Sequence, residues 1–243
     1  MSAVLEAHGV VKRYGGLVAN DGVEMTVERG EVRGIIGPNG AGKTTFVNLL
    51  TGVQTPDAGT ITLEGASLVG LEPYEIAARG LVRTFQVAKV FGNLSVTENL
   101  LLPYFAHGRG VATRGLERAA ELLRLSTLAP LADAPAKSLS GGQRMLLQAC
   151  AGFMIPDVKV YVLDEPFAGI NPVVKDTLIN LIQIENRERG MTFLVVSHEM
   201  AIVRRLCPRV TVMIAGKVAA EGVGLIDLLV VLLIAAYLGR APA

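Results

Sequence analysis

Eight consecutive residues, GPNGAGKT at positions 37–44, have the spacing of a phosphate-binding loop, G-x-x-x-x-G-K-[ST]. The glycines allow a tight curve that turns several backbone N–H groups towards phosphate oxygens, and the N-terminus of a following helix would attract the same anion. In such a loop Lys43 reaches the β- and γ-phosphates of a nucleotide, and the Thr44 hydroxyl binds Mg²⁺. The predicted nucleotide-binding residues are Gly37, Pro38, Asn39, Gly40, Ala41, Gly42, Lys43, Thr44 and Thr45.

Two adjacent carboxylates follow a second apolar run, KVYVL at residues 159–163. At the tip of a strand, Asp164 can bind the hydration shell of Mg²⁺, and Glu165 is placed to polarise an attacking water molecule. An Asp-Glu pair by itself is also typical of a solvated strand end. Together with the loop, it predicts a Mg²⁺-dependent nucleoside triphosphatase.

The elements that must position these residues can be recognised in the sequence. Residues 32–36 form a short apolar run that stops at the loop, and residues 44–50 have a helical pattern. Residues 159–163 and 192–196 are continuous apolar runs, typical of strands buried on both faces of a parallel sheet. The helical periodicity of residues 173–189 between them predicts a βαβ crossover.

Three further patterns complete the predicted architecture. Alternating or β-branched stretches at residues 5–11, 23–27 and 59–63 predict an antiparallel sheet near the N-terminus, and residues 209–214 and 217–221 predict a hairpin. The region 87–157 has few strand signals but contains helical stretches at 116–125 and 142–154. We therefore expect an α/β core with an inserted helical subdomain.

Composition limits the class of protein. Of the 243 residues, 51% are apolar and 19% are charged, which excludes a disordered chain and allows one large α/β domain or two small ones. The net charge of +1 argues against a general nucleic-acid binder. Two cysteines, Cys150 and Cys207, are too few for a disulfide framework and are expected as small buried hydrophobic residues in a reducing compartment. Because the N-terminal stretch lacks the apolar region of a secretory signal, we expect the protein in the cytoplasm.

A third motif lies between the loop and Asp164: Leu139, Ser140, Gly141, Gly142 and Gln143. It resembles the signature sequence of ABC-type ATPases, and the order of the three motifs is the order of that family. Ser140 can cap a helix that begins near Gly141, so that its hydroxyl and the adjacent N–H groups could bind a phosphate. The resemblance covers residues 4–222.

Other positions match the family in the same order. Tyr14 resembles the aromatic residue that stacks on adenine, and Gln86 resembles the glutamine that senses Mg²⁺, water and the membrane partner. His198 resembles the switch histidine that contacts the γ-phosphate. The resemblance implies that Glu165, His198 and Gln86 are catalytic and that Thr44, Gln86 and Asp164 surround Mg²⁺. The loop expected to cross the dimer interface contains Ala168, Gly169, Ile170 and Asn171, with Asn171 where many relatives have Asp.

The resemblance also implies a fold and partners. The fold is a P-loop NTPase core with a mostly parallel sheet, an N-terminal antiparallel β-subdomain and an inserted helical subdomain. Its predicted bounds are about 1–86 and 158–222 for the catalytic core and about 87–157 for the helical subdomain. Two ATPase chains, identical or different, would enclose two ATP molecules head to tail, each between the loop of one chain and the signature helix of the other. Further implied partners are transmembrane permease subunits and, indirectly, an extracytoplasmic substrate-binding protein, with no nucleic acid. The chain would then lie on the inner face of the cell membrane.

Four short stretches indicate a particular branch of the family. They resemble the corresponding sequences of the importer ATPases for branched-chain amino acids, urea or amides. These stretches are residues 83–86, 98–100, 169–172 and 236–239. The lipopolysaccharide-export ATPase is a near relative with a similar ending. A soluble ABC protein acting on nucleic acid or ribosomes would usually carry two cassettes or a coiled-coil insertion, and a P-loop kinase or GTPase leaves the signature and His198 unexplained.

The sequence allows more than one interpretation of two segments. Residues 87–96 would form much of the permease-docking surface, but their apolar members could equally belong to the core. The C-terminal segment 223–243 begins with an almost uninterrupted apolar run to residue 238, where relatives usually have a polar stretch. That run could be a buried helix, a membrane-associated one, although it is short for a span, or a local oddity of this sequence.

Overall fold

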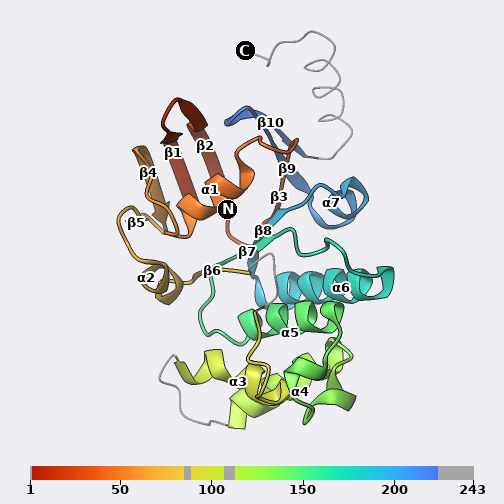
Figure 1. Cartoon of the computed structure of the whole chain (residues 1–243). Coiled ribbons are helices and arrows are strands. Elements are labelled where there is room, and N and C mark those ends of the chain that lie inside the picture. The colour runs from red at the N-terminus through yellow and green to blue at the C-terminus, as the bar shows by residue number, and fades with distance from the viewer. Residues whose placement is uncertain (1, 85–88, 107–112, 224–243) are drawn as a thin grey trace.

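The computed structural model describes residues 2–84, 89–106 and 113–223 of the chain. Two sheets and a set of helices make up this part of the protein (Figure 1). The strands are β1 (Ala3–Tyr14), β2 (Leu17–Glu28), β3 (Val32–Ile36), β4 (Ala58–Leu63), β5 (Ala66–Ser67), β6 (Leu81–Arg83), β7 (Val160–Asp164), β8 (Thr192–Val196), β9 (Arg209–Ile214) and β10 (Lys217–Val223). The α-helices are α1 (Lys43–Leu50), α2 (Pro73–Ala78), α3 (Val96–Ala106), α4 (Thr113–Leu125), α5 (Gly141–Phe153), α6 (Pro172–Arg189) and α7 (Met200–Leu206).

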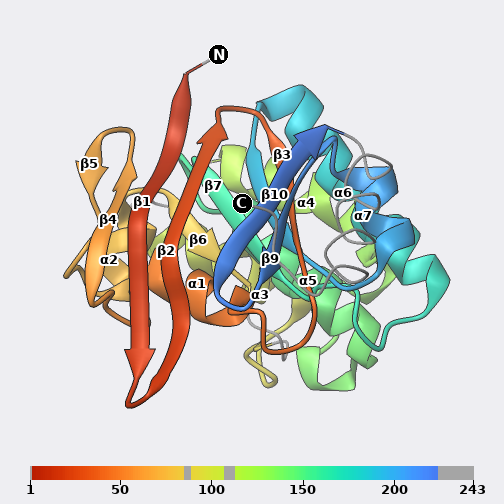
Figure 2. The same cartoon turned by 90° about the horizontal axis from the view of Figure 1, so that it is seen from above.

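The two sheets differ in strand direction. One has the order β2-β1-β4-β5 and is antiparallel throughout. The other has the order β10-β9-β3-β8-β7-β6, in which every pair is parallel except the β9–β10 hairpin. Seen from above, the antiparallel sheet lies on one side of the molecule and α6 and α7 lie on the other (Figure 2). The predicted antiparallel sheet, parallel strands and C-terminal hairpin are confirmed.

Side chains alternate between two hydrophobic cores along the central strands. Ile35, Val160 and Val162 pack on one face, with α1 and the antiparallel sheet, whereas Ile36 and Tyr161 pack on the other, with α5 and α6. Because both faces of these strands are covered, all five residues of β3, β7 and β8 are buried. This explains why β7 and β8 read as continuous apolar runs in the sequence and why β3 is mostly apolar.

The helices α3, α4 and α5 lie between β6 and β7 in the chain, and α3 and α4 form the end of the molecule opposite β1 and β2 (Figure 1). This is the predicted inserted helical region, although its limits at residues 87 and 157 stay a prediction. The helix α5 packs tightly on β7: a Cβ atom added at Gly152 would lie 2.0 Å from the Tyr161 hydroxyl oxygen. Only glycine therefore fits at position 152 without a shift of Tyr161.

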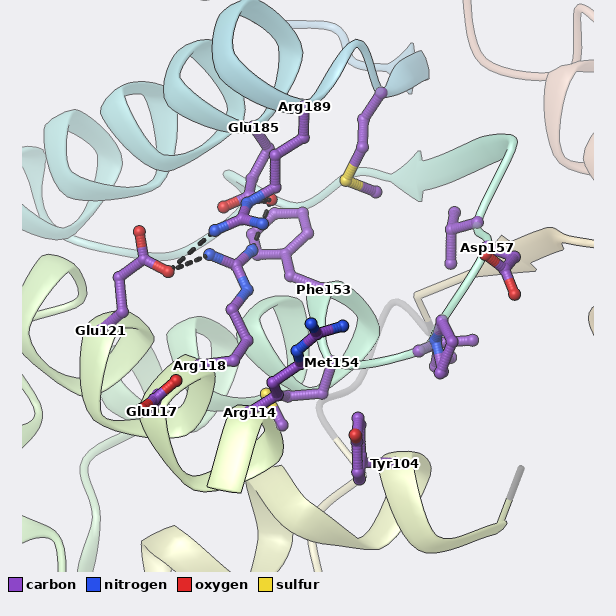
Figure 3. Close-up of a pocket in the computed structure, with 14 residues that line it drawn as sticks. Tyr104, Arg114, Glu117, Arg118, Glu121, Phe153, Met154, Asp157, Glu185 and Arg189 are labelled. Carbon is purple, nitrogen blue, oxygen red and sulfur yellow. Dashed lines mark hydrogen bonds and ion pairs between the residues drawn. The ribbon is translucent and has the colours of Figure 1, made fainter. Parts of the chain in front are cut away.

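An ion-pair network connects α4 to α6, with the largely buried Arg118 and the buried Glu185 at its centre and Arg189 and Glu121 partly exposed. Arg118 of α4 donates to Glu185 of α6 at 2.5 Å and to Glu121 at 2.8 Å, and Arg189 contacts both carboxylates (Figure 3). These side chains line a cavity of about 550 Å³ together with Phe153 and Met154 of α5 and its C-cap. The carboxylate of Glu185 is inaccessible to solvent, and its Oε1 atom has no hydrogen-bond partner in the described part of the chain. The contacts between Arg118 and Glu185 join α4 to α6.

Candidate nucleotide-binding site

The phosphate-binding loop leaves the buried strand β3 at Ile36 and enters α1 at Lys43, which confirms the predicted strand–loop–helix arrangement. Two of its glycines are required by the backbone. Gly37 has φ +151° and a Cβ atom there would lie 2.1 Å from the carbonyl oxygen of Met213, while Gly42 has φ +94° and a Cβ atom would lie 2.3 Å from that of Ala19. The loop is therefore held between the strand β9 and the strand β2 in a path that other residues would obstruct.

Lys43 folds back across this loop. Its Nζ atom donates hydrogen bonds to the carbonyl oxygens of Gly37 at 2.8 Å and Pro38 at 3.0 Å. The residue is 8% exposed, so these two hydrogen bonds hold its positive charge at the loop. A cation held here, beside the N-terminus of α1, creates a site suited to the phosphates of a nucleotide.

A cavity of about 620 Å³ opens in front of the loop. It is lined by Tyr14, Leu17, Val18, Ala19, Asn39, Gly40, Ala41, Gly42, Lys43, Thr44, Thr45, Glu165 and Ala215. The structure thus brings most of the predicted nucleotide-binding residues together with Tyr14 and Glu165. Tyr14 is 43% exposed and Leu17 is 65% exposed, so both side chains present surface to the cavity.

Asp164 ends β7 and is almost completely buried. Its Oδ2 atom accepts a hydrogen bond from Arg83 at 3.2 Å, and its backbone N–H donates to the Thr84 hydroxyl at 3.3 Å. Burial raises the pKa of the Asp164 carboxyl above its usual value, the Arg83 charge opposes this shift, and the nearby Glu165 charge adds to it. Among the described residues, the only side chain that donates a hydrogen bond to the Asp164 carboxylate is Arg83, through Oδ2.

The donor set fits a Mg²⁺ ion bound mainly through the nucleotide. Thr44 is exposed on the cavity. Because β3 and β7 both run parallel to β8, the loop that follows β3 and Asp164 at the end of β7 lie at the same edge of the sheet. Among the described residues no group of three or more His, Cys, Asp or Glu side chains could hold a metal without further ligands. Mg²⁺ usually keeps several waters and uses substrate phosphates as ligands, so a hydroxyl and one carboxylate are a sufficient protein contribution.

Glu165 and His198 are in direct contact. The Oε2 atom of Glu165 lies 2.8 Å from Nδ1 of His198, whose side chain is 61% exposed. The backbone N–H of Glu165 donates to the carbonyl oxygen of Val196 at 2.9 Å, which fixes the residue against β8. Glu165 has φ +50°, an unfavourable conformation for a residue with a side chain. In this backbone conformation the Glu165 side chain lines the cavity at the edge of the sheet.

The signature residues are not part of this cavity. Ser140 is the N-cap of α5: its hydroxyl accepts a hydrogen bond from the N–H of Gln143 at 3.3 Å, and the Gln143 side chain accepts one from the Ser140 N–H at 2.9 Å. The predicted cap is therefore confirmed. Asn171 caps α6 in the same way, accepting from the N–H of Val174 at 3.0 Å. Gly169 has φ +69° in the loop before it.

Several sequence predictions fall wholly or partly outside the described residues. Gln86 and the first two residues of the predicted docking surface lie in the segment 85–88. The apolar C-terminal run after Val223 and the 236–239 stretch lie in the segment 224–243. Conversely, the sequence did not predict the contact between Arg83 and Asp164. The only signal in the sequence was the place of Arg83 in the RTFQ stretch, three residues before Gln86.

The fold and this site define an ATP-binding cassette. Residues 20–168 match the ABC transporter family, and the chain belongs to it; proteins of this family bind and hydrolyse ATP. The chain is 36% identical over 230 residues to the probable branched-chain amino acid transport ATP-binding protein LivG of Archaeoglobus fulgidus, covering 90% of this chain and 89% of that protein. It is also 36% identical to the high-affinity branched-chain amino acid transport ATP-binding protein BraF of Pseudomonas aeruginosa, covering 90% and 91%.

A solved structure has the same fold over almost the whole chain. It is the ADP conformation of an ATP-binding cassette of an ABC transporter, with a TM-score of 0.84, 32% sequence identity and coverage of 99% of this chain and all of that one. In the part of the chain that the structure describes, no helix combines the length and the apolar character needed to cross a membrane.

Proposed function

We propose that this chain is the ATP-hydrolysing subunit of an importer for branched-chain amino acids or related small amides, working with separate membrane permeases from the inner face of the cell membrane. The observation that carries the ATPase part is the single cavity shared by the phosphate-binding loop, Thr44 and Glu165. The importer branch is supported by the relatives named above, which align with this chain over nearly their full lengths.

Different residues of the ATPase site would bind the nucleotide, hold Mg²⁺ and activate water. The loop and Lys43 would bind the phosphates, and Tyr14 would stack on adenine. Thr44 and Asp164, with Gln86, would hold Mg²⁺, which neutralises the charge that develops on the phosphates during transfer. Glu165 would accept a proton from the attacking water, and its contact with His198 orients the carboxylate.

A second chain would complete the site. Because Ser140 lies outside the cavity of its own chain, the phosphate that it is predicted to bind would belong to the partner, with the loop Ala168 to Asn171 between the two. A nucleotide that makes contacts only in the closed dimer drives closure, and hydrolysis removes these contacts.

A groove beside β6 is suited to the permease. It encloses about 330 Å³ and is lined mainly by apolar side chains, which include Val53, Pro73, Ala77, Leu81, Ile155 and Tyr161. Lys89 lines it too, directly after the undescribed segment that contains Gln86. The predicted docking surface at residues 87–96 is divided: Phe91 is 65% exposed, whereas Val96 is fully buried and belongs to the core.

Reconstitution tests this proposal. The full chain would be co-expressed with the permease subunits encoded beside it and placed in vesicles with the matching binding protein. We expect ATP-dependent uptake of labelled leucine or of a small amide, and no ATPase stimulation by lipopolysaccharide. Stimulation by lipopolysaccharide without uptake would favour the export alternative, and co-purification with ribosomes or DNA in place of permeases would refute both.

A further inference from the structure

One arginine connects three elements of the ATPase site. Arg83 is the last residue of β6, and its side chain is only 13% exposed. Its Nη1 atom donates to Asn48 Oδ1 of α1 at 2.7 Å, and its Nη2 atom donates to Asp164 Oδ2 of β7 at 3.2 Å. A further contact from Nη1 reaches the Thr51 hydroxyl, the C-cap of α1, at 3.3 Å.

The shape of the guanidinium makes this connection rigid. Its donors lie in one plane at fixed angles, so a group bound to Nη1 and a group bound to Nη2 are held at a set distance from each other. The group at Nη1 belongs to the helix that begins at Lys43, and the group at Nη2 is the Asp164 carboxylate. Arg83 therefore fixes the spacing between the phosphate-binding side and the carboxylate side of the site.

The contact also distinguishes the two oxygens of Asp164. Oδ2 is engaged with Arg83, whereas Oδ1 accepts no hydrogen bond from any residue that the structure describes. The carboxylate is 4% exposed, so solvent contributes little to its orientation. With Oδ2 held by the arginine, rotation of the carboxylate is restricted, and Oδ1 is the oxygen that Arg83 does not engage.

We propose that Arg83 is a positioning residue of the ATPase site, which holds Asp164 against α1 so that Oδ1 is kept for the hydration shell of Mg²⁺. The inference rests on the proposed roles of Asp164 and Thr44. Arg83 also lines the groove proposed for the permease. A partner in that groove would therefore touch the residue that orients Asp164.

Metal binding without turnover tests the role. The full-length chain would be loaded with a non-hydrolysable ATP analogue and titrated with Mn²⁺, followed by electron paramagnetic resonance. In Arg83→Gln we expect unchanged affinity for the analogue in EDTA, but an increase of about tenfold in the half-saturating Mn²⁺ concentration, the size expected for one lost charge-assisted hydrogen bond. Arg83→Lys keeps the charge without the fork and should lie between Arg83→Gln and the parent.

Arg118→Gln is the matched control. The side chain of Arg118 is also 13% exposed and pairs with a buried carboxylate, but it lies in the ion-pair network between α4 and α6. We expect it to lower stability and to leave the Mn²⁺ midpoint unchanged.

An unchanged midpoint in Arg83→Gln would overturn the role of Arg83. If that variant does not fold, Arg83→Lys decides by the same criterion. A parent chain that binds the analogue with no effect of metal would instead refute the proposed Mg²⁺ site.

Discussion

At the scale of single residues, Glu165 combines two unusual features. It has a positive φ, which costs of order 1–3 kcal/mol at a non-glycine position, and its carboxylate already contacts His198. Strain of this kind persists only where the surroundings hold it, here through the hydrogen bond to Val196. The strained backbone is therefore consistent with a carboxylate whose direction matters for the proposed reaction.

Glu165→Gln should keep nucleotide binding and lose turnover. The amide preserves the size of the side chain but cannot accept a proton from water, so phosphate release should fall by at least about 100-fold. ATP should then trap a closed dimer, which light scattering would detect. Glu188→Gln, the same change at an exposed position of α6, serves as the control. A Glu165→Gln chain that hydrolyses ATP like the parent would show that another group is the base.

The two cysteines should be unreactive in the folded protein. Both are buried and unpaired, and burial raises the pKa of the Cys150 thiol to about 12 and that of Cys207 to about 12. Because the thiolate is the reactive form, a disulfide reagent at pH 8 should label neither residue until urea unfolds the chain. Rapid labelling of the native protein would mean that these regions open locally.

At the scale of elements, the N-terminus of α5 serves both stability and the proposed chemistry. Its capping box uses Ser140 and Gln143, so the signature motif is ordered before any partner chain arrives. A helix end that is already formed can meet a phosphate without a further ordering cost.

Two substitutions at Ser140 separate these roles. Ser140→Ala removes the cap and should lower the free energy of unfolding by about 1 kcal/mol, measured by urea denaturation. Ser140→Asp restores a good cap, so its stability should be close to that of the parent, but it places a negative charge where a phosphate is expected. Phosphate release should fall in both variants. Full activity in Ser140→Asp would contradict the assignment of Ser140 to phosphate binding.

The helices and strands that could be predicted are those whose hydrophobic pattern is visible within their own residues. The strands β3 and β8 were predicted with their observed bounds, because burial on both faces leaves mostly apolar residues, although β3 also contains the buried Arg33. The helix α3 was missed since it contains Pro103 and has no clear polar face, and β6 was missed since three residues paired with β7 leave no periodic signal.

The same limit applies to the site. The glycines and Lys43 could be predicted because the loop is continuous in sequence. The contacts of Arg83 could not, since Asn48 and Asp164 are 35 and 81 residues away along the chain. Likewise, no local signal shows that Leu17 and Ala215 line the same cavity.

At the scale of the whole molecule, one chain holds the parts of a site but does not bring all of them together. The loop, Tyr14 and Glu165 share a cavity that the signature residues do not line. The proposed head-to-tail dimer explains this separation, and it makes a prediction that depends on which chain carries which substitution.

Mixed dimers test the arrangement. If each ATP site is shared between two chains, a dimer with Ser140→Ala on one chain and Lys43→Ala on the other keeps one intact site. A dimer with both substitutions on the same chain keeps none. Phosphate release from tagged, purified heterodimers should therefore be higher in the first pairing. The reverse order would show that each chain completes its own site, and loss of ATP binding by Lys43→Ala, measured by calorimetry, is the control.

The connection between α4 and α6 has a mechanical consequence. Leaving a buried charge without its partner costs about 3–5 kcal/mol, so the contact between Arg118 and Glu185 resists separation of α4 from α6. A displacement of α4 relative to α6 would therefore have to keep these two side chains together or lose that free energy.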